Sequence, residues 1–253
     1  MYDSLIENYR YFLKDSVRKT IDFSLTDQSK GISPPPIEKP FDPNACIIDL
    51  PARNTWTHLM EIDLLSAIEN RKSRRYFSST LLTLEELSFL LWATQGIREY
   101  VNESHALRTV PSAGARHAIE TYLCILTIEG MERGIYRYLP LEHQLMLVYH
   151  EPSASEKIAQ AAFGQSFIGN ASVVFIWTAI PYRMEWRYGI AAHKVIAIDA
   201  GHICQNLYLS CEAIGAGTCA VAAYDQEAMD HLVGVDGKDE FVIYLAPVGK
   251  VAT

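Results

Sequence analysis

The chain has 253 residues, of which 49% are hydrophobic and 21% are charged, values typical of a soluble globular protein. Acidic side chains outnumber basic ones by 30 to 22, giving a formal net charge of −8. This argues against a nucleic-acid partner, because neutralising phosphates needs a basic excess. The chain has neither an apolar signal segment at its start nor an apolar run of about 18 residues, so we expect no membrane partner and a cytoplasmic location.

The first 55 residues are expected to form an N-terminal helix and a proline-rich arm. Residues 4–23 mix charged and aromatic side chains at helical spacing, whereas residues 24–51 contain Pro34-Pro35-Pro36 and three further prolines, which favour an extended chain. Such an arm is expected to lie on its own domain or on a second subunit, and a loosely ordered tail is the alternative. Residues 56–253 then form the body.

The body is expected to begin with two helices. Residues 63–70 predict a short helix, and Thr83 with Glu86 forms a capping box that opens a second helix ending near Gly96. Residues 97–116 carry turn and loop signals. The later apolar patterns predict strands at 119–128, 135–139, 144–149, 172–180, 218–222 and 241–246, and helices at 153–163, 199–215 and 226–233, with a turn at 164–170.

The helix expected at 199–215 is the centre of the fold. Ile203, Leu207, Ser210 and Ile214 follow helical spacing, and a second apolar stripe lies beside them, so we expect burial on several sides. Gly215 is the expected C-terminal stop. Because helices and strands are interspersed without strict alternation, the predicted class is α+β, with a mostly antiparallel central sheet flanked by helices.

The cysteines give no sign of a disulfide framework or a metal site. They are five in number, none forms a CxxC pair, and most lie in apolar segments, so we expect buried free thiols in a reducing cytosol: Cys46, Cys124, Cys204, Cys211 and Cys219. His202 and Cys204 are two residues apart on a predicted helix and therefore face different directions, so no metal is expected.

The strongest chemical signal is the basic run that follows the first helix of the body. Arg71, Ser73 and Arg75 alternate, so in an extended segment they point to the same side, with Lys72 and Arg74 between them. Two guanidinium forks and a hydroxyl on one side suit a phosphate or the polar edge of a ring. The alternative is a solvated basic turn.

Two other motifs are rejected on their context. Residues 215–220 match G-x-G-x-x-A, but a helix precedes these glycines and a strand follows, the reverse of a dinucleotide fingerprint. Residues 164–169 resemble a nucleophile elbow with the second glycine misplaced, which disfavours a serine hydrolase.

Taken together, several motifs resemble the nitroreductase superfamily, and more closely its SagB-type and McbC-like dehydrogenase branch. The motifs are Arg71-x-Ser73-x-Arg75, Pro111-Ser112-Ala113-Gly114-Ala115, Gly134-Ile135-Tyr136-Arg137-Tyr138, Phe163-Gly164-Gln165, Arg187-Tyr188-Gly189 and Gly201-His202. Their order and spacing, more than any one of them, carry the resemblance over residues 60–250. The N-terminal arm lies outside it.

The resemblance implies a domain-exchanged homodimer that binds FMN between its subunits. Arg71, Lys72, Ser73 and Arg75 would hold the phosphate, the ribityl chain and the pyrimidine edge. The other subunit would contribute Pro111, Ser112, Ala113, Gly114 and Arg116. Cys219, Ala220, Val221, Ala222 and Ala223 would run past the isoalloxazine, with a backbone N–H near Ala222 directed at flavin N5; small residues there let the backbone approach a flat ring.

The sequence departs from the family pattern in two places. The usual basic pair near the C-terminus is missing, which leaves Lys250 to help at the phosphate. Azoline-oxidising relatives have a basic residue followed by Tyr ahead of Gly-His, where this chain has Lys194-Val195; azole formation on a peptide is therefore in doubt. Lys194 is the candidate catalytic residue, and a solvated lysine in a first helical turn is the alternative.

The resemblance implies a ping-pong oxidoreductase. NAD(P)H would deliver hydride to flavin N5 and leave, and a small-molecule acceptor would then take the electrons. The acceptor would be a nitro compound, a quinone or a peptide-derived ring, and the sequence does not choose among them. The alternative is a non-catalytic or differently reacting flavin-binding dimer that keeps the fold.

Overall fold

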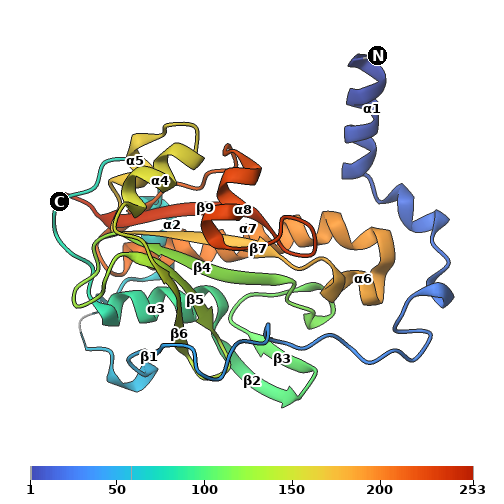
Figure 1. Cartoon of the computed structure of the whole chain (residues 1–253), viewed down its shortest axis with the longest axis horizontal. Helices are drawn as coiled ribbons and strands as arrows, with labels where there is room; N and C mark the ends of the chain where they lie inside the picture. Colours follow the sequence, from blue (N-terminus) through green and yellow to red (C-terminus); the bar gives the residue numbers. More distant parts are fainter. Residues whose placement is uncertain (1, 58, 253) are drawn as a thin grey trace.

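The computed structural model describes residues 2–57 and 59–252, which form a seven-stranded sheet with helices on both faces (Figure 1). The strand order is β1-β6-β5-β4-β7-β9-β8, and every neighbouring pair is antiparallel. The predicted α+β class is confirmed. None of the helices in these residues is both long and apolar enough to cross a membrane.

The bounds of the elements are as follows. The strands are β1 Ile47–Asp49, β2 Ile97–Asn102, β3 His105–Arg108, β4 Ile119–Ile125, β5 Gly134–Leu139, β6 Gln144–His150, β7 Val173–Ala179, β8 Ala216–Thr218 and β9 Phe241–Lys250. The α-helices are α1 Tyr2–Leu13, α2 Leu64–Asn70, α3 Leu84–Gln95, α4 Ala154–Ala161, α5 Ser166–Gly169, α6 Tyr182–Tyr188, α7 Ala192–Glu212 and α8 Gln226–Val233. Short 3-10 helices are η1 Asp15–Thr20, η2 Phe23–Leu25, η3 Arg53–Thr55, η4 Ala113–Ala115 and η5 Gly189–Ala191.

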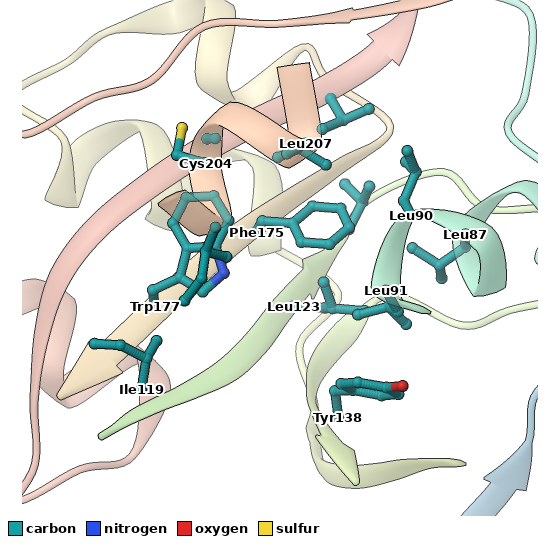
Figure 2. Close-up of a cluster of buried hydrophobic side chains, with 14 of the residues drawn as sticks. Leu87, Leu90, Leu91, Ile119, Leu123, Tyr138, Phe175, Trp177, Cys204 and Leu207 are labelled. Carbon is teal, nitrogen blue, oxygen red and sulfur yellow. The ribbon is translucent and has the colours of Figure 1, made fainter. Parts of the chain in front are cut away.

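The two faces of the sheet bury two separate cores, because successive side chains of a strand point to opposite faces. In β7, Phe175 and Trp177 belong to the core under α3 and α7, whereas Val174 and Ile176 belong to the core under α4, α5 and α8. Figure 2 shows Phe175 and Trp177 between the α3 leucines and the α7 residues Cys204 and Leu207. Both strand faces are apolar because both are covered.

Helix α7 begins a full turn and more before the predicted start. It runs from Ala192 to Glu212, since residues 192–198 contain no helix-breaking residue, and Asp199 lies within it rather than at its cap. Gly215, at φ +60°, follows its end as expected. One broad face of α7 is buried, but Ile198, Gly201, His202 and Gln205 are exposed, so burial on several sides is not reached within one chain.

Several local predictions were wrong. Residues 97–108 form the β2–β3 hairpin instead of loops, the predicted turn at 164–170 contains α5, and α6 occupies the polar stretch after Pro181. Strand β8 starts at Ala216 and ends at Thr218, so residues 219–222 form no regular strand, although Val221 is bridged to Leu245 of β9. In contrast, the short helix predicted at 63–70 is α2, which Asp63 caps, and the Thr83–Glu86 capping box opens α3 as predicted.

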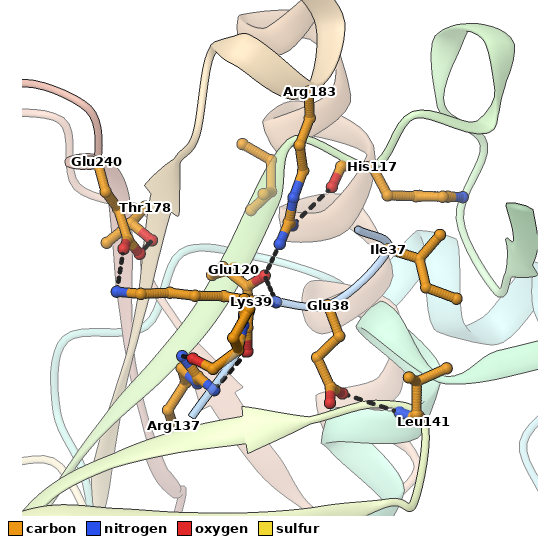
Figure 3. A network of polar contacts seen from close by, with 12 residues as sticks. Ile37, Glu38, Lys39, His117, Glu120, Arg137, Leu141, Thr178, Arg183 and Glu240 are labelled. Carbon is orange, nitrogen blue, oxygen red and sulfur yellow. Dashed lines mark hydrogen bonds and ion pairs between the residues drawn. The ribbon is translucent and has the colours of Figure 1, made fainter. Parts of the chain in front are cut away.

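The N-terminal arm runs along the body and completes a buried charge network (Figure 3). Near α6, the Gln28 N–H donates to the Trp186 carbonyl at 2.9 Å. Farther on, the Arg137 guanidinium donates to the Lys39 carbonyl at 2.8 Å, and the Lys39 ammonium lies 2.5 Å from the Glu240 carboxylate. The arm then adds β1 to the edge of the sheet beside β6.

All five cysteines are free. Cys46 is exposed, and the other four, Cys124, Cys204, Cys211 and Cys219, are buried. Burial raises the pKa of the Cys204 thiol to about 12, which keeps it protonated and unreactive near neutral pH. Within residues 2–57 and 59–252, no group of three or more His, Cys, Asp or Glu side chains is arranged to hold a metal ion.

Candidate functional site

The basic segment after α2 is fixed against strand β8. The Arg74 N–H donates to the Thr218 carbonyl at 2.8 Å, and Ser73 pairs with Thr218 in a parallel bridge. Gly217 permits this approach, because a Cβ at that position would lie 2.5 Å from Cδ of Arg74. The alternating Arg-Ser-Arg side chains are therefore held on a rigid edge.

Tyr208 of α7 joins the basic segment to the chain beyond β8. Its hydroxyl shares a 2.9 Å hydrogen bond with the Ser73 hydroxyl and accepts another from the Ala220 N–H, also at 2.9 Å. The Arg71 guanidinium carbon lies 5.2 Å from the centre of the Tyr208 ring, a cation–π contact. Tyr208 belongs to the second apolar stripe predicted for this helix, and no local signal in the sequence marks it as part of a site.

The positive charge of this segment is largely uncompensated. Arg74 lies 3.9 Å from the Glu212 carboxylate. In the part of the chain that the structure describes, Arg71, Lys72 and Arg75 have no carboxylate within 4.0 Å, and Arg75 instead lies 5.9 Å from the Phe167 ring centre. Three free cations and a hydroxyl on one edge suit an anion such as a phosphate monoester.

Residues 219–223 form a thin strip beside the basic segment. Val221 anchors it through paired backbone bonds with Leu245 of 2.8 and 3.1 Å, and the Gln165 amide donates to the Ala223 carbonyl at 2.9 Å. Ala222 is exposed, and its N–H donates no hydrogen bond within the described chain. Because Val221 is buried and Ala223 is small, the exposed Ala222 N–H leaves room for a flat ring to approach the backbone. Cys219 is buried, so its side chain points away from this surface.

The Pro111–Arg116 loop lies elsewhere, at the other half of α7. Ser112 and Ala113 lie close to the buried Asp199 carboxylate; burial raises the pKa of that carboxyl, and the nearby Ser112, His202 and Ala113 partly offset the rise. The backbone is left-handed at Gly114, at φ +60°, where a Cβ would lie 2.6 Å from the Tyr188 hydroxyl. Ala115 is also at positive φ, +50°, which is strained for a residue other than glycine, so the loop is held in a strained conformation against α6 and α7.

Arg116 turns away from the rest of this loop. Its guanidinium donates to the Ser104 carbonyl at 2.6 Å and lies 5.3 Å from the Trp186 ring centre. Burial lowers its pKa, and the charge of Arg187 adds to this effect. In this structure Arg116 therefore braces the loop against the β2–β3 hairpin.

One chain keeps the two groups of predicted residues apart. The loop meets α7 at Asp199 and the basic segment meets it at Tyr208, nine residues later, which is about 13 Å along a helix.

The two predicted lysines have different surroundings. The Lys250 ammonium contacts the Glu86 carboxylate and donates to the Ile214 carbonyl at 2.5 Å, so in this structure it is directed into the body. Lys194 is half-buried in the first turn of α7, where its charge helps lower the pKa of Asp15, after the larger effect of the Arg18 hydrogen bond. It lies fourteen residues, or about 21 Å, before Tyr208 on the same helix.

The model of the nitroreductase family matches residues 68–250 of this chain, which is most of the body. The chain belongs to the nitroreductase family. The match covers the basic segment, the 111–116 loop and the 219–223 strip, and leaves out the N-terminal arm. The resemblance predicted from the sequence motifs is thereby confirmed.

Individual relatives agree with this nitroreductase assignment. The chain is 34% identical over 190 residues to a protein of Methanocaldococcus jannaschii named as a nitroreductase, covering 75% of this chain and 92% of that one. A solved nitroreductase structure from Ralstonia eutropha superposes with a TM-score of 0.67 at 26% identity, covering 87% of this chain and 95% of that one.

The fold also resembles a chain of the E. coli microcin synthetase McbBCD complex, solved with truncated pro-MccB17 bound. The TM-score is 0.61 at 20% identity, over 81% of this chain and 79% of that one. This likeness is one of fold, and it agrees with the resemblance to the McbC-like branch.

Proposed function

We propose that this nitroreductase-family chain is an FMN-dependent oxidoreductase that transfers reducing equivalents from NAD(P)H to a small-molecule acceptor. The observation that carries the proposal is the edge where the uncompensated Arg71 and Arg75 lie beside the Ser73–Tyr208–Ala220 hydrogen bonds and the exposed Ala222 N–H. This edge combines an anion site with a flat approach to the backbone, as a flavin phosphate and a flavin ring require. Family membership supports a flavin oxidoreductase as the class.

The residues present fit FMN. Arg71, Lys72 and Arg75 would neutralise the phosphate and the ribityl oxygens, and Ser73 would be held in place for them by Tyr208. When bound, FMN supplies the hydride chemistry at its N5 atom, and the chain supplies position and charge. The Ala222 N–H would donate to the flavin ring, and residues 219–223 would exclude water from one side of that ring. Lys250, held by Glu86, would act on the phosphate at most through its charge.

We further propose that the working form is a homodimer built on the exposed face of α7. Lys194, Ile198, Gly201, His202, Gln205 and Leu209 lie on this face at exposed or half-buried positions. These positions are symmetric about the point midway between residues 201 and 202: residue 194 corresponds to 209, 198 to 205, and 201 to 202. Two antiparallel copies of α7 would therefore place each position opposite its pair, as an isologous interface requires. A Cβ at Gly201 would meet no atom within 4 Å, so this glycine would allow the two α7 helices to approach closely at the two-fold axis.

This arrangement supports a site completed by both subunits. A two-fold axis near Gly201 and His202 would place Asp199 of one subunit opposite position 204 of the other, one helical turn from Tyr208. The Ser112–Gly114 loop attached at Asp199 would then come close to the partner's basic segment. Lys194 of the partner would face the region between this loop and the basic segment, where a side chain that binds the electron acceptor is needed.

FMN binding by arginine variants tests the proposal. The double variant Arg71→Ala/Arg75→Ala should lose at least one charge-assisted contact at each position, about 1.5–3 kcal/mol apiece, as measured by fluorescence titration of FMN. Arg98→Ala, at an exposed position in β2, is the matched control and should bind FMN normally. Equal FMN affinity in the double variant and the control would overturn the phosphate assignment.

A further inference from the structure

The N-terminal helix α1 has an apolar face with no evident role in its own body. Leu5, Ile6, Tyr9, Phe12 and Leu13 follow the i, i+1, i+4, i+7, i+8 spacing of one helix face, and all but Ile6 are exposed. Figure 1 shows α1 projecting away from the sheet beyond the α6 end of the molecule. An exposed amphipathic helix of this kind needs an apolar surface to cover it.

A second apolar surface lies at the opposite end of α7. A groove of about 780 Å³ is lined by residues 59–63 together with Phe89, Leu209, Ser210 and Ala213. It continues onto the outer face of α2, where Leu64 is 67%, Leu65 66% and Ile68 54% exposed. This groove and the outer face of α2, which we call the α2 groove, lead directly into Arg71–Arg75 of the proposed phosphate site.

We propose that α1 of one protomer binds in the α2 groove of a second copy of this chain, an inference that rests on the homodimer of the proposed function. The two surfaces are brought together by the pairing of Lys194 with Leu209. Asp15, at the base of α1, begins η1, and η1 packs against η5, which directly precedes the first turn of α7 and Lys194. Leu209 lines the α2 groove. In the antiparallel α7 pair, the base of α1 therefore reaches the partner near Leu209, at the start of the partner's groove.

The occupant matches the groove in length and character. Helix α1 has 12 residues and is about 18 Å long, so from its base it can extend past the groove and along α2. Its apolar face would cover Leu64, Leu65 and Ile68, while Glu7 and Tyr11 on the opposite face stay in solvent. The arm holds the base in place, since Tyr182 donates to Asp27 at 2.9 Å and Trp186 donates to the Ile32 carbonyl at 2.9 Å.

The consequence for function is a site wall contributed by the partner. Helix α2 ends at Asn70, and Arg71 follows it directly. A helix seated on α2 would immobilise the start of the basic segment and shield that side of the phosphate site from solvent. The N-terminal extension would thus be part of the partner's cofactor site, although it lies outside the family match.

Disulfide trapping between two differently tagged chains tests the placement. In a Cys46→Ser background, which removes the exposed native thiol, Tyr9→Cys is placed in one chain and Leu64→Cys or Ile68→Cys in the other. Co-purified and mildly oxidised, these pairs should give a disulfide-linked heterodimer, because seated side chains come within the Cα separation of about 7 Å that a disulfide allows. Tyr11→Cys, on the opposite face of α1, is the matched control and should give none.

The dimer dissociation constant provides a second readout. Tyr9→Asp should raise it at least tenfold in analytical ultracentrifugation, whereas Tyr11→Asp should change it less than twofold. The α1 placement would be overturned if the wild type is a dimer but the cysteine pairs form no cross-link and Tyr9→Asp and Tyr11→Asp change the dissociation constant equally. That result would leave the homodimer intact. A wild-type chain that binds FMN as a monomer would refute the homodimer and this inference together.

Discussion

Replacing Glu120 with glutamine tests the buried charge network beneath the N-terminal arm. Glu120 is 2% exposed, and its Oε1 lies 2.5 Å from Nη2 of Arg183, which is 3% exposed. The same carboxylate accepts the Lys39 backbone N–H at 3.2 Å. Glutamine keeps the shape and one acceptor but leaves the Arg183 charge buried without its partner.

The expected loss follows from that geometry. Removing one partner of a buried ion pair costs about 3–5 kcal/mol, and the retained amide oxygen favours the lower end, about 3 kcal/mol. In a domain of this size, that corresponds to a fall of about 6–12 °C in Tm. Urea unfolding followed by tryptophan fluorescence measures the loss in the free energy of unfolding. Glu99→Gln, at an exposed position in β2, is the control.

The pH dependence gives an independent check. Burial alone would raise the pKa of Glu120, but the charges of Arg183, Arg108 and Arg137 outweigh it, and the pKa is lowered. A depressed carboxyl pKa contributes stability that is fully present above the unfolded value of about 4.3 and is lost as pH falls through the folded value. The stability difference between wild type and Glu120→Gln should therefore shrink below about pH 4.3. A loss under 1 kcal/mol at pH 7, independent of pH, would refute the reasoning.

Three further variants address the proposed site. Tyr208→Phe removes the hydroxyl that bonds Ser73 and leaves the Ala220 N–H without its partner, so FMN affinity should fall about fivefold or more, at about 1 kcal/mol per lost bond; unchanged titrations would contradict this. Lys194→Met should leave flavin reduction by NAD(P)H intact and slow acceptor turnover at least tenfold in stopped-flow assays; if both half-reactions are unaffected, Lys194 has no catalytic role. Gly114→Ala should destabilise the fold by about 1–3 kcal/mol in urea unfolding, whereas Gly31→Ala, also at positive φ but with nothing within 4 Å, should cost less; equal losses would show that the contact with Tyr188 is unimportant.

Local patterns were sufficient for much of the fold. The capping box at Thr83 and Glu86 marks the start of α3 because its hydrogen bonds are made within four residues. The apolar runs mark β4 and β7 because both faces of the central strands are covered. The β2–β3 hairpin was not predicted because most of β2 is exposed, so its sequence does not alternate between apolar and polar residues. Helix α6 has seven residues, as α2 has, but no side chain caps its N-terminus, whereas Asp63 caps α2.

The sequence by itself determined the α+β class, the length of most central elements, the basic Arg71–Arg75 segment and the family motifs, because each depends on residues close together in the chain. Tertiary structure alone decided what those motifs contact. Tyr208 reaches Ser73 across 135 positions, and the arm's Lys39 reaches Glu240 across 201, distances over which no sequence period carries information. It also decided which face of α7 stays exposed, since an apolar helix does not specify which of its sides the sheet covers and which remains in solvent.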